Sequence, residues 1–473
     1  MARFKPYNVD QPFLLPASLH DYVPEGHLSK LVHRVVEQLD SGIIEGKYSD
    51  LGQRTYHPKL LVKLLFYGYA VGERSGRTIA RRCETDTAYM YLAQTYRPDF
   101  RTINDFRKNN LEELSGYFVE IVRILKELGL VQLGQVNIDS TKLKANASKR
   151  RTKSEQEYLE WLDRVKKRMD EILREAGDVD AEEDRLYGDK RGDELPEEIN
   201  TEEKMKRKLE EVMKRFKDGK KKLNLTDQDA QYVRVGNGRI EVGYNCQAAV
   251  TENQIIVGSE VTPEANDYKV LPEIVEGVEA VLDEQVKEVA ADSGYSSYET
   301  YEYLDQRGKV GYIPDRDMVR QERAGVGRYE RDSFTYDSER DEYICPEGQR
   351  LKRHSERDEV VCGRRLQQVI YRGVCCESCP KKVLCTKDKV RRLTIDRRKI
   401  LVDVMRERLR TEEGQRKYQK RLHTVEPIFG HLKYNLGYRQ FLLRTIEKVK
   451  GEFRLMCIGY NLKRMNRLLA STG

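Results

Sequence analysis

The stretch LVQLGQVNIDSTKLKANAS, residues 130–148, decides the fold. Its first half carries side chains that favour a β-strand, at Val131, Leu133, Val136 and Ile138. These residues predict a strand that ends at Asp139. A carboxylate at the end of a strand lies where side chains from adjacent strands meet, so the neighbouring elements decide what Asp139 can do.

A second stretch of this kind, VKEVAADSGYSS at 286–297, predicts a strand that ends at Asp292 before a turn. The other elements, in chain order, are antiparallel strands from 233 onward, a helix over 265–282, a helix around 298–307, a strand over 308–314 and a long helix that carries Glu426. This order predicts an α/β fold with a ribonuclease-H-like mixed sheet and flanking helices.

Composition excludes a membrane-embedded protein. The chain has 473 residues, of which 35% are charged, compared with about 25% in an average soluble domain. No run approaches the ~18 apolar residues that a membrane-spanning helix needs. The first residues carry no basic-then-apolar signal pattern, so we expect a cytoplasmic protein.

The positive charge is concentrated near the end of the chain. Residues 391–473 hold 21 Lys and Arg against 8 Asp and Glu, a net charge of +13, whereas the rest of the chain sums to −6. A basic region of this kind indicates a surface that faces a polyanion such as DNA. The alternative is a solvated helical face.

Residues 1–129 predict an all-α N-terminal domain. Within it, SGRTIARRCETDTAYMYLA at 75–93 predicts two short helices, the second capped by Thr85 or Asp86. The pair is similar to a DNA-binding helix-turn-helix, and the alternative is an ordinary helical bundle. Buried positions would be Ile79, Cys83 and Leu92, and the arginines available for DNA phosphates would be Arg77, Arg81 and Arg82.

Two insertions are predicted within the catalytic domain, which we place at residues 130–473. Residues 149–222 have apolar side chains spaced three or four apart in two charged segments, which predicts a helical hairpin. Its Trp161, the sole tryptophan, would either pack in the hairpin seam or stack on an extruded base. Residues 316–395 form a Cys-rich insertion with few helical signals.

The cysteines of that insertion predict a structural zinc site. Cys376 and Cys379 form a CxxC pair, Cys385 follows six residues later, and Cys345 lies in a Cys-Pro-x-Gly turn. Four thiolates would close a tetrahedral Zn²⁺ site, with Cys375 or Cys362 as substitutes, and the alternative is a set of free thiols. Three further cysteines lie in apolar patterns typical of a core: Cys83, Cys246 and Cys457.

Converging carboxylates require a counter-ion. Asp139 and Asp292 end adjacent strands, and a helix crossing the sheet can deliver Glu426. Such oxygen ligands suit Mg²⁺ or Mn²⁺. Two such ions about 4 Å apart activate a water or a 3′-hydroxyl and stabilise the leaving oxygen of a phosphodiester. The alternative for each Asp is capping of the turn that follows it.

Local sequence adds a family resemblance. The segments NIDSTKLKANAS, VAADSGYSS and HTVEPIFGHLKYNLGYRQF resemble DDE transposases of bacterial insertion sequences, in the branch with a Cys-rich insertion. The resemblance implies that Asp139, Asp292 and Glu426 are the metal ligands. It also implies a Tyr-Arg-Glu-Lys signature on the last helix. The DNA-contacting residues implied there are Tyr418, Arg421, Lys433 and Arg439.

Two positions in this block follow from spacing. Lys433 lies seven residues after Glu426, so on a regular helix both side chains project from nearly the same face. Arg421 stands five residues before Glu426, one more than in the related families. His423, three residues before Glu426, would contact DNA or water, or pack against the sheet.

The resemblance implies a Mg²⁺-dependent DNA transposase. It would bind the terminal inverted repeats of its element, hydrolyse the DNA ends and join the 3′-hydroxyls to target DNA. A homodimer or larger synaptic complex in the bacterial cytoplasm, associated with the nucleoid, is expected, with no membrane partner. The alternatives are a domesticated, catalytically silent DNA-binding protein and a structure-selective nuclease.

Overall fold

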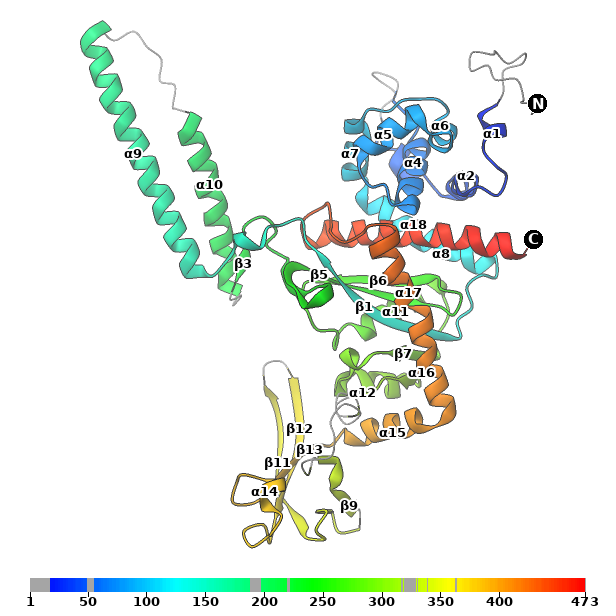
Figure 1. The fold of residues 1–473 in the computed structure, drawn as a ribbon, viewed down its shortest axis with the longest axis vertical. Helices are drawn as coiled ribbons and strands as arrows, with labels where there is room; N and C mark the ends of the chain where they lie inside the picture. Colours follow the sequence, from blue (N-terminus) through cyan, green and yellow to red (C-terminus); the bar gives the residue numbers. More distant parts are fainter. Residues whose placement is uncertain are drawn as a thin grey trace, which may run out of the picture.

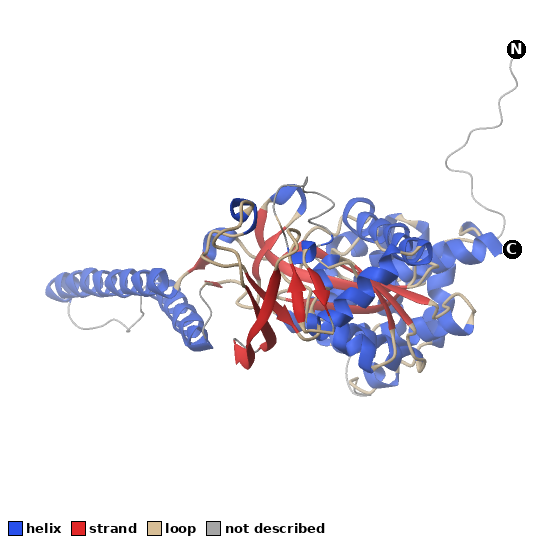
Figure 2. Cartoon of the chain, turned by 90° about the horizontal axis from the view of Figure 1, so that it is seen from below, coloured by secondary structure: helices blue, strands red, loops and turns tan. Residues whose placement is uncertain are grey.

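The computed structural model describes residues 18–48, 55–187, 197–218, 222–315, 318, 329, 331–337, 339–361 and 364–472. It is a mixed α/β structure with a helical N-terminal region (Figure 1). The N-terminal helices lie next to the C-terminal helix α18, the central sheet lies below them, and a second sheet lies at the far end. Seen from below, a helical hairpin projects away from the rest of the chain (Figure 2). None of the described helices is long and apolar enough to cross a membrane.

The N-terminal region packs around α4. This helix begins at Pro58, where a missing N–H costs nothing, and ends at Gly72, whose φ of +88° suits glycine. It contacts α2, α6 and α18. The helices of this region are α1 (Leu19–Tyr22), α2 (Leu28–Gln38), α3 (Gly42–Glu45), α4 (Pro58–Val71), α5 (Gly76–Thr85), α6 (Thr87–Ala93), α7 (Phe100–Asn109) and α8 (Leu111–Glu127).

The two short helices predicted at 75–93 are α5 and α6. The predicted core residues Ile79, Cys83 and Leu92 are buried. Asp86 caps α6 by accepting hydrogen bonds from the backbone N–H groups of the next turn. Asp86 is the only residue between the two helices, whereas the turn of a DNA-binding helix-turn-helix has three or four residues. The junction therefore differs from the expected motif, because its cap leaves no room for a longer turn.

The central sheet mixes parallel and antiparallel strands. Its order is β4-β5-β1-β7-β8, and β6 also pairs with β5, on the edge opposite β1. Strand β1 is antiparallel to β5 and parallel to β7, which is parallel to β8. The strands are β1 (Gln135–Lys144), β4 (Gln231–Arg234), β5 (Ile240–Val250), β6 (Ile256–Thr262), β7 (Glu288–Ala291) and β8 (Val310–Tyr312).

The prediction that the first strand ends at Asp139 is wrong. Strand β1 continues to Lys144, because β5 pairs with it along the whole length from Asn137 to Lys144 and satisfies its backbone groups. Only the parallel partner ends earlier: the last pair between β1 and β7 joins Ile138 to Ala291. Asp139 therefore lies inside β1 but just beyond the end of β7.

Helices pack on this sheet from several segments of the chain. Helix α16 contacts β1 and β7, α18 contacts β6, and α11 contacts β5 and β6. These helices and their neighbours are α11 (Leu271–Leu282), α12 (Tyr298–Gln306), α15 (Lys399–Arg410), α16 (Glu412–Thr424), α17 (Glu426–Gly430) and α18 (Ile446–Thr472). Short 3₁₀ turns are η1 (Lys149–Arg151), η2 (Arg215–Asp218), η3 (Gly236–Gly238), η4 (Ser293–Tyr295) and η5 (Arg331–Ser333).

The long helix expected around Glu426 is broken into three pieces. Helix α16 ends at Thr424, α17 begins at Glu426, and a π-helical segment, η6 (His431–Asn435), follows. Pro427 supplies no N–H at the start of α17, which explains the break after α16. A π-helical turn holds more residues than an α-helical one, so the regular spacing that would place Lys433 above Glu426 does not apply.

The predicted helical hairpin consists of α9 (Glu155–Tyr187) and α10 (Glu197–Lys214). The two helices share a small apolar cluster that includes Tyr158, Val165, Leu209 and Val212. Trp161 packs against this cluster and stacks on Tyr158, which confirms its place in the hairpin seam. Two short strands close the base of the hairpin, β2 (Thr152–Lys153) and β3 (Leu223–Asn224).

The Cys-rich region is an antiparallel sheet with its own core. Strand order is β13-β12-β11-β10-β9, and the core includes Phe334, Leu351, Leu393 and Ile395. Its elements are β9 (Thr335–Asp337), β10 (Glu342–Ile344), β11 (Arg350–Val361), β12 (Arg364–Gly373), α14 (Lys382–Cys385) and β13 (Arg392–Asp396).

Candidate active site

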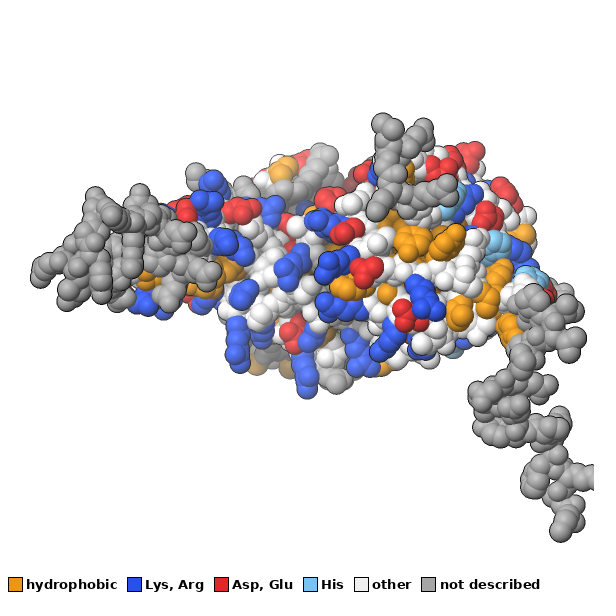
Figure 3. All heavy atoms as spheres, turned by 90° about the horizontal axis from the view of Figure 1, so that it is seen from above, with side chains coloured by type: hydrophobic (Ala, Val, Ile, Leu, Met, Phe, Trp, Pro, Cys, Tyr) orange, Lys and Arg blue, Asp and Glu red, His pale blue; other side chains and the backbone are white. Residues whose placement is uncertain are grey.

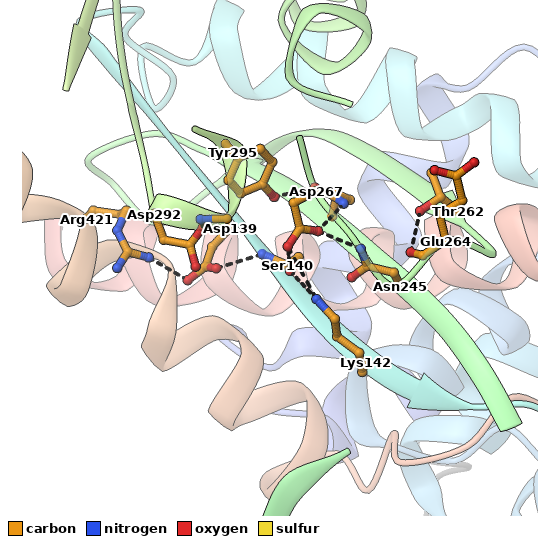
Figure 4. Close-up of polar contacts among 12 residues, drawn as sticks. Asp139, Ser140, Lys142, Asn245, Thr262, Glu264, Asp267, Asp292, Tyr295 and Arg421 are labelled. Atoms are coloured by element: carbon orange, nitrogen blue, oxygen red, sulfur yellow. Dashed lines mark hydrogen bonds and ion pairs between the residues drawn. The ribbon is translucent and has the colours of Figure 1, made fainter. Parts of the chain in front are cut away.

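Strands β1 and β7 bring two of the predicted catalytic residues together. Asp139 and Asp292 each follow the last pair between these strands, Ile138 with Ala291. Because parallel strands in register run side by side, the two carboxylates lie next to each other (Figure 4). The register between β1 and β7 thus sets the spacing of the pair.

Each carboxylate is held by neighbouring donors. Asp139 Oδ2 accepts a hydrogen bond from Arg421 Nη1 at 2.7 Å, and its Oδ1 accepts one from the backbone N–H of Ser140 at 2.7 Å. Asp292 Oδ1 accepts from the backbone N–H of Gly294 at 2.9 Å and caps the turn η4. The capping interpretation therefore holds for Asp292, and it does not conflict with a second role for its other oxygen.

The pKa of Asp139 shows the influence of the third predicted carboxylate, Glu426. Burial raises the pKa of Asp139 to about 6; Arg421 opposes that rise, while Asp292 and, more weakly, Glu426 add to it. Glu426 is exposed at the first position of α17. Asp292 and Glu426 are therefore both within electrostatic reach of Asp139, and their negative charges disfavour its ionised form.

The oxygen ligands of these residues suit a hard divalent cation. Among the described residues, however, no three Asp, Glu, His or Cys side chains are grouped closely enough to hold a metal ion. Asp139 is turned toward Arg421, and Glu426 stands out into solvent. The donor chemistry therefore fits Mg²⁺ or Mn²⁺, and the side chains as placed would have to close on the ion.

A fourth carboxylate beside this site has no counterpart in the sequence-based predictions. Asp267, in the loop before α11, is 7% exposed. Its Oδ1 accepts hydrogen bonds from Asn245 Nδ2 (2.6 Å) and Gln247 Nε2 (2.7 Å). Its Oδ2 accepts from Ser140 Oγ at 3.1 Å and pairs with Lys142 Nζ at 3.4 Å (Figure 4).

Hydrogen bonds also link the partners of Asp267 to the segment that follows Asp292. Gln247 also accepts a hydrogen bond from the hydroxyl of Tyr295, three residues after Asp292. A Cβ added to Gly294 would lie 2.8 Å from Asp292 Oδ1 and 3.1 Å from Asp267 Oδ2, so a larger residue there would have to displace a carboxylate oxygen. The sequence signal is weak, because the role of Asp267 depends on the register that places Asn245 and Gln247 opposite Lys142 and Ser140.

Lys433 lies against the sheet. It is half-buried, and burial lowers its pKa; the neighbouring positive charge of Lys142 lowers it further. Two lysines therefore lie close enough for their charges to interact, Lys433 from η6 and Lys142 from β1, and Lys142 is paired with Asp267.

The other predicted DNA-binding residues are placed differently. Arg421 is buried and ion-paired with Asp139, and its contact with DNA stays a prediction. Tyr418 is half-buried, with its ring 5.5 Å from the Arg421 guanidinium. Arg439 is exposed over the ring of Tyr434. His423 is exposed rather than packed against the sheet.

The three N-terminal arginines are all exposed on α5. Arg82 is ion-paired with Glu73 at 2.9 Å, which reduces the charge that it offers to DNA. Arg77 lies over the ring of Phe100, and Arg81 has an exposed side chain.

The predicted zinc ligands gather around one cavity at the end of the second sheet. Cys345, Cys376, Cys379 and Cys385 all line it, together with the exposed Cys375. Backbone N–H groups of Gln349 and Arg391 donate to the sulfur atoms of Cys345 (3.2 Å) and Cys376 (3.4 Å). Four thiols are a ligand set that suits zinc. Within the described region, however, they do not lie close enough together to hold a metal ion. Cys362 lies outside the described residues.

The remaining cysteines are core residues, as predicted. Cys83, Cys246 and Cys457 are each at most 1% exposed. Burial raises the pKa of all three thiols, which makes them unreactive.

Comparison with protein families gives two matches. A model described as Transposase DDE domain matches residues 344–466, a segment that includes Glu426, Lys433 and the four cysteines. A second, described as Transposase domain (DUF772), matches residues 17–109. Both matches support a DDE transposase of an insertion sequence. Asp139 and Asp292 lie outside both matched segments. No match was found among curated proteins or among solved structures.

Proposed function

We propose that this transposase binds the terminal inverted repeats of its insertion sequence, cleaves the DNA ends by metal-dependent hydrolysis and joins the 3′-hydroxyls to target DNA. One observation carries the proposal: Asp139 and Asp292 lie side by side at the end of the β1–β7 pairing, with Glu426 in electrostatic reach. The family matches support a transposase, and the chemistry of these residues supports phosphodiester cleavage.

The three carboxylates would hold Mg²⁺ or Mn²⁺, two ions in the full site, which activate the attacking water or 3′-hydroxyl. Arg421 would keep Asp139 ionised and oriented when no cation is bound, because the two are ion-paired at 2.7 Å. Lys433, close to Lys142, would hold a DNA phosphate beside the carboxylates. Asp267 would position Ser140 and Lys142 through its hydrogen bonds.

We also propose a ribonuclease-H-like catalytic domain over residues 130–473. The mixed sheet with β1 between an antiparallel and a parallel partner supports it. The hairpin at 149–222 and the Cys-rich sheet within 316–395 would be insertions, because each has its own apolar cluster. Residues 1–129 would form the N-terminal DNA-binding domain.

One structural Zn²⁺ in the Cys-rich sheet is a further part of the proposal. The four thiols line one cavity, and two of them accept backbone N–H hydrogen bonds, which favours the thiolate form that zinc requires. A cation there would tie β10 to the loop after β12.

The reaction joins two DNA ends in one event, so the active form would be a dimer or larger synaptic complex, acting in the cytoplasm on nucleoid DNA. The two alternative functions are a domesticated, catalytically silent DNA-binding protein and a structure-selective nuclease. An activity assay distinguishes both from a transposase.

The assay uses labelled element-end DNA, with Mg²⁺, with Mn²⁺ or with neither. Wild type should nick the ends and join them to target DNA only with metal, and Asp292→Asn should do neither while still binding the ends. Binding without cleavage in either metal would identify a silent DNA-binding protein. Cleavage that ignores the end sequence would identify a nuclease.

A further inference from the structure

A basic groove lies beside the helix that carries Glu426. Its empty space is about 870 Å³. One wall comes from α17 and η6 and the other from α18. The lining residues are Gln254, Pro427, Gly430, His431, Tyr434, Asn435, Tyr460, Lys463, Arg464 and Arg467. Lys463, Arg464 and Arg467 are basic and none of the lining residues is acidic, so the groove carries a net positive charge.

The charges of the groove have no counter-ions within the described part of the chain. Lys463 and Arg467 lie one helical turn apart on α18, and no ion pair holds either of them there. The adjacent positive charges of Lys463 and Arg467 lower the pKa of His431, in addition to the larger effect of burial. Like charges held together without carboxylates cost free energy, which a bound polyanion would recover.

The groove borders the helix that carries Glu426, one of the three predicted catalytic carboxylates. Pro427 lines the groove and directly follows Glu426. Ile428, Phe429 and Leu432 bury the inner face of this helix, so Glu426 and the groove residues occupy its outer part. A helix with its side chains is about 10–12 Å across, a span that a DNA strand covers within a few nucleotides at ~3.4 Å rise each.

An exposed aromatic residue lies in the lining of the groove. Tyr434 is 72% exposed, and the Arg439 guanidinium lies 5.1 Å from the centre of its ring. An exposed ring covered by a guanidinium offers a flat surface with a positive charge, which suits a sugar or an unstacked base. Lys and Arg side chains are also prominent over the middle of the face seen from above (Figure 3).

We propose that this groove binds backbone phosphates of the DNA strand that continues past the cleaved bond, with Lys463 and Arg467 as the phosphate contacts and Tyr434 against a nucleotide at the rim. This inference rests on the proposed function, since it takes the strand at Glu426 to be the substrate. The groove would bind the backbone rather than read the base sequence, because its proposed contacts, Lys463 and Arg467, are held by no ion pair in the described residues that would orient them toward base edges.

The test compares Lys463→Gln/Arg467→Gln with Arg164→Gln/Lys166→Gln, a matched double variant that removes two exposed charges from the hairpin helix α9. Binding of element-end DNA is measured over a range of salt concentrations. We expect the groove variant to bind about tenfold more weakly at low salt and to lose about 1.8 from the salt slope, two phosphates at ~0.9 each. Thermal unfolding of both variants checks that they fold.

A photo-crosslinking amino acid at position 434 gives an independent readout, with position 336 on β9 as the control, since Tyr336 is also exposed. Crosslinks to end DNA from position 434 alone support the groove. An unchanged salt slope in a folded groove variant, or equal crosslinking from both positions, would overturn it. Failure of the proposed function is seen separately, as wild-type protein that binds end DNA but never cleaves it.

Discussion

Arg421 Nη1 donates to Asp139 Oδ2 at 2.7 Å, joining helix α16 to strand β1 at a point where both side chains are largely buried. The pair holds the ionised form of a carboxylate that burial and two neighbouring acids would otherwise protonate. Helix α16 packs on β1 and β7, which brings Arg421 to Asp139.

Removing the arginine should therefore weaken the protein and raise the pKa of Asp139 further. Breaking a buried pair from one side costs about 3–5 kcal/mol of unfolding free energy. Arg421→Gln should show a loss of this order in urea unfolding, and Arg421→Lys should recover part of it. If Arg421→Gln unfolded at the same urea concentration as wild type, the ion pair would not be important for stability.

Metal binding should depend on pH through Asp139. The pKa of this carboxyl is raised to about 6 in the folded protein, so below that pH a proton must leave before a cation binds. Mn²⁺ affinity, measured by electron paramagnetic resonance, should fall about tenfold per pH unit below 6 and level off above it. A profile that stays flat down to pH 4.5 would show that Asp139 is not a ligand.

Asp267 should matter although it is not among the three expected carboxylates. All four partners of Asp267 donate hydrogen bonds to it. In Asp267→Asn an N–H group would face some of these donors, and leaving them without an acceptor should lower the free energy of unfolding by about 1–3 kcal/mol. We expect lower stability and slower cleavage. Asp403→Asn, which changes a half-exposed carboxylate on α15, is the control and should behave as wild type.

The Cys-rich sheet should lose one zinc ion when its CxxC pair is removed. Metal analysis of Cys376→Ser/Cys379→Ser should find about one ion fewer than in wild type, whereas Cys375→Ser should keep it, because Cys375 is exposed. Equal zinc content in the wild type and the double variant would refute the site.

The sole tryptophan allows the hairpin to be followed on its own. Leu209 is fully buried in the cluster that Trp161 packs against, so Leu209→Ala should leave a cavity that costs about 2–5 kcal/mol. Trp161 fluorescence should then report hairpin unfolding at lower urea than circular dichroism of the whole chain. Coincident transitions would show that the hairpin unfolds together with the sheet.

Local patterns predicted the parts of the fold that depend on local contacts. The β-prone runs before Asp139 and Asp292 indicated two adjacent strands, and apolar spacing indicated the hairpin that packs Trp161. The length of β1 could not be predicted in this way, because it depends on pairing with β5, more than one hundred residues later.

The missed site residues have a similar cause. The ion pair of Arg421 depends on the packing of α16 on β1, which joins residues 282 apart in the sequence and which periodicity does not reveal. Asp267 depends on the β1–β5 register. Long-range packing and register, rather than residue type, decide both.

The most direct test of the account is a change of metal preference at Asp292. Asp292→Cys should cleave element-end DNA poorly in Mg²⁺ and recover part of the activity in Mn²⁺, which accepts sulfur more readily, while Asp292→Asn should be inactive in both. Wild-type cleavage by Asp292→Asn in Mg²⁺ would contradict the claim that Asp139, Asp292 and Glu426 hold the catalytic metal.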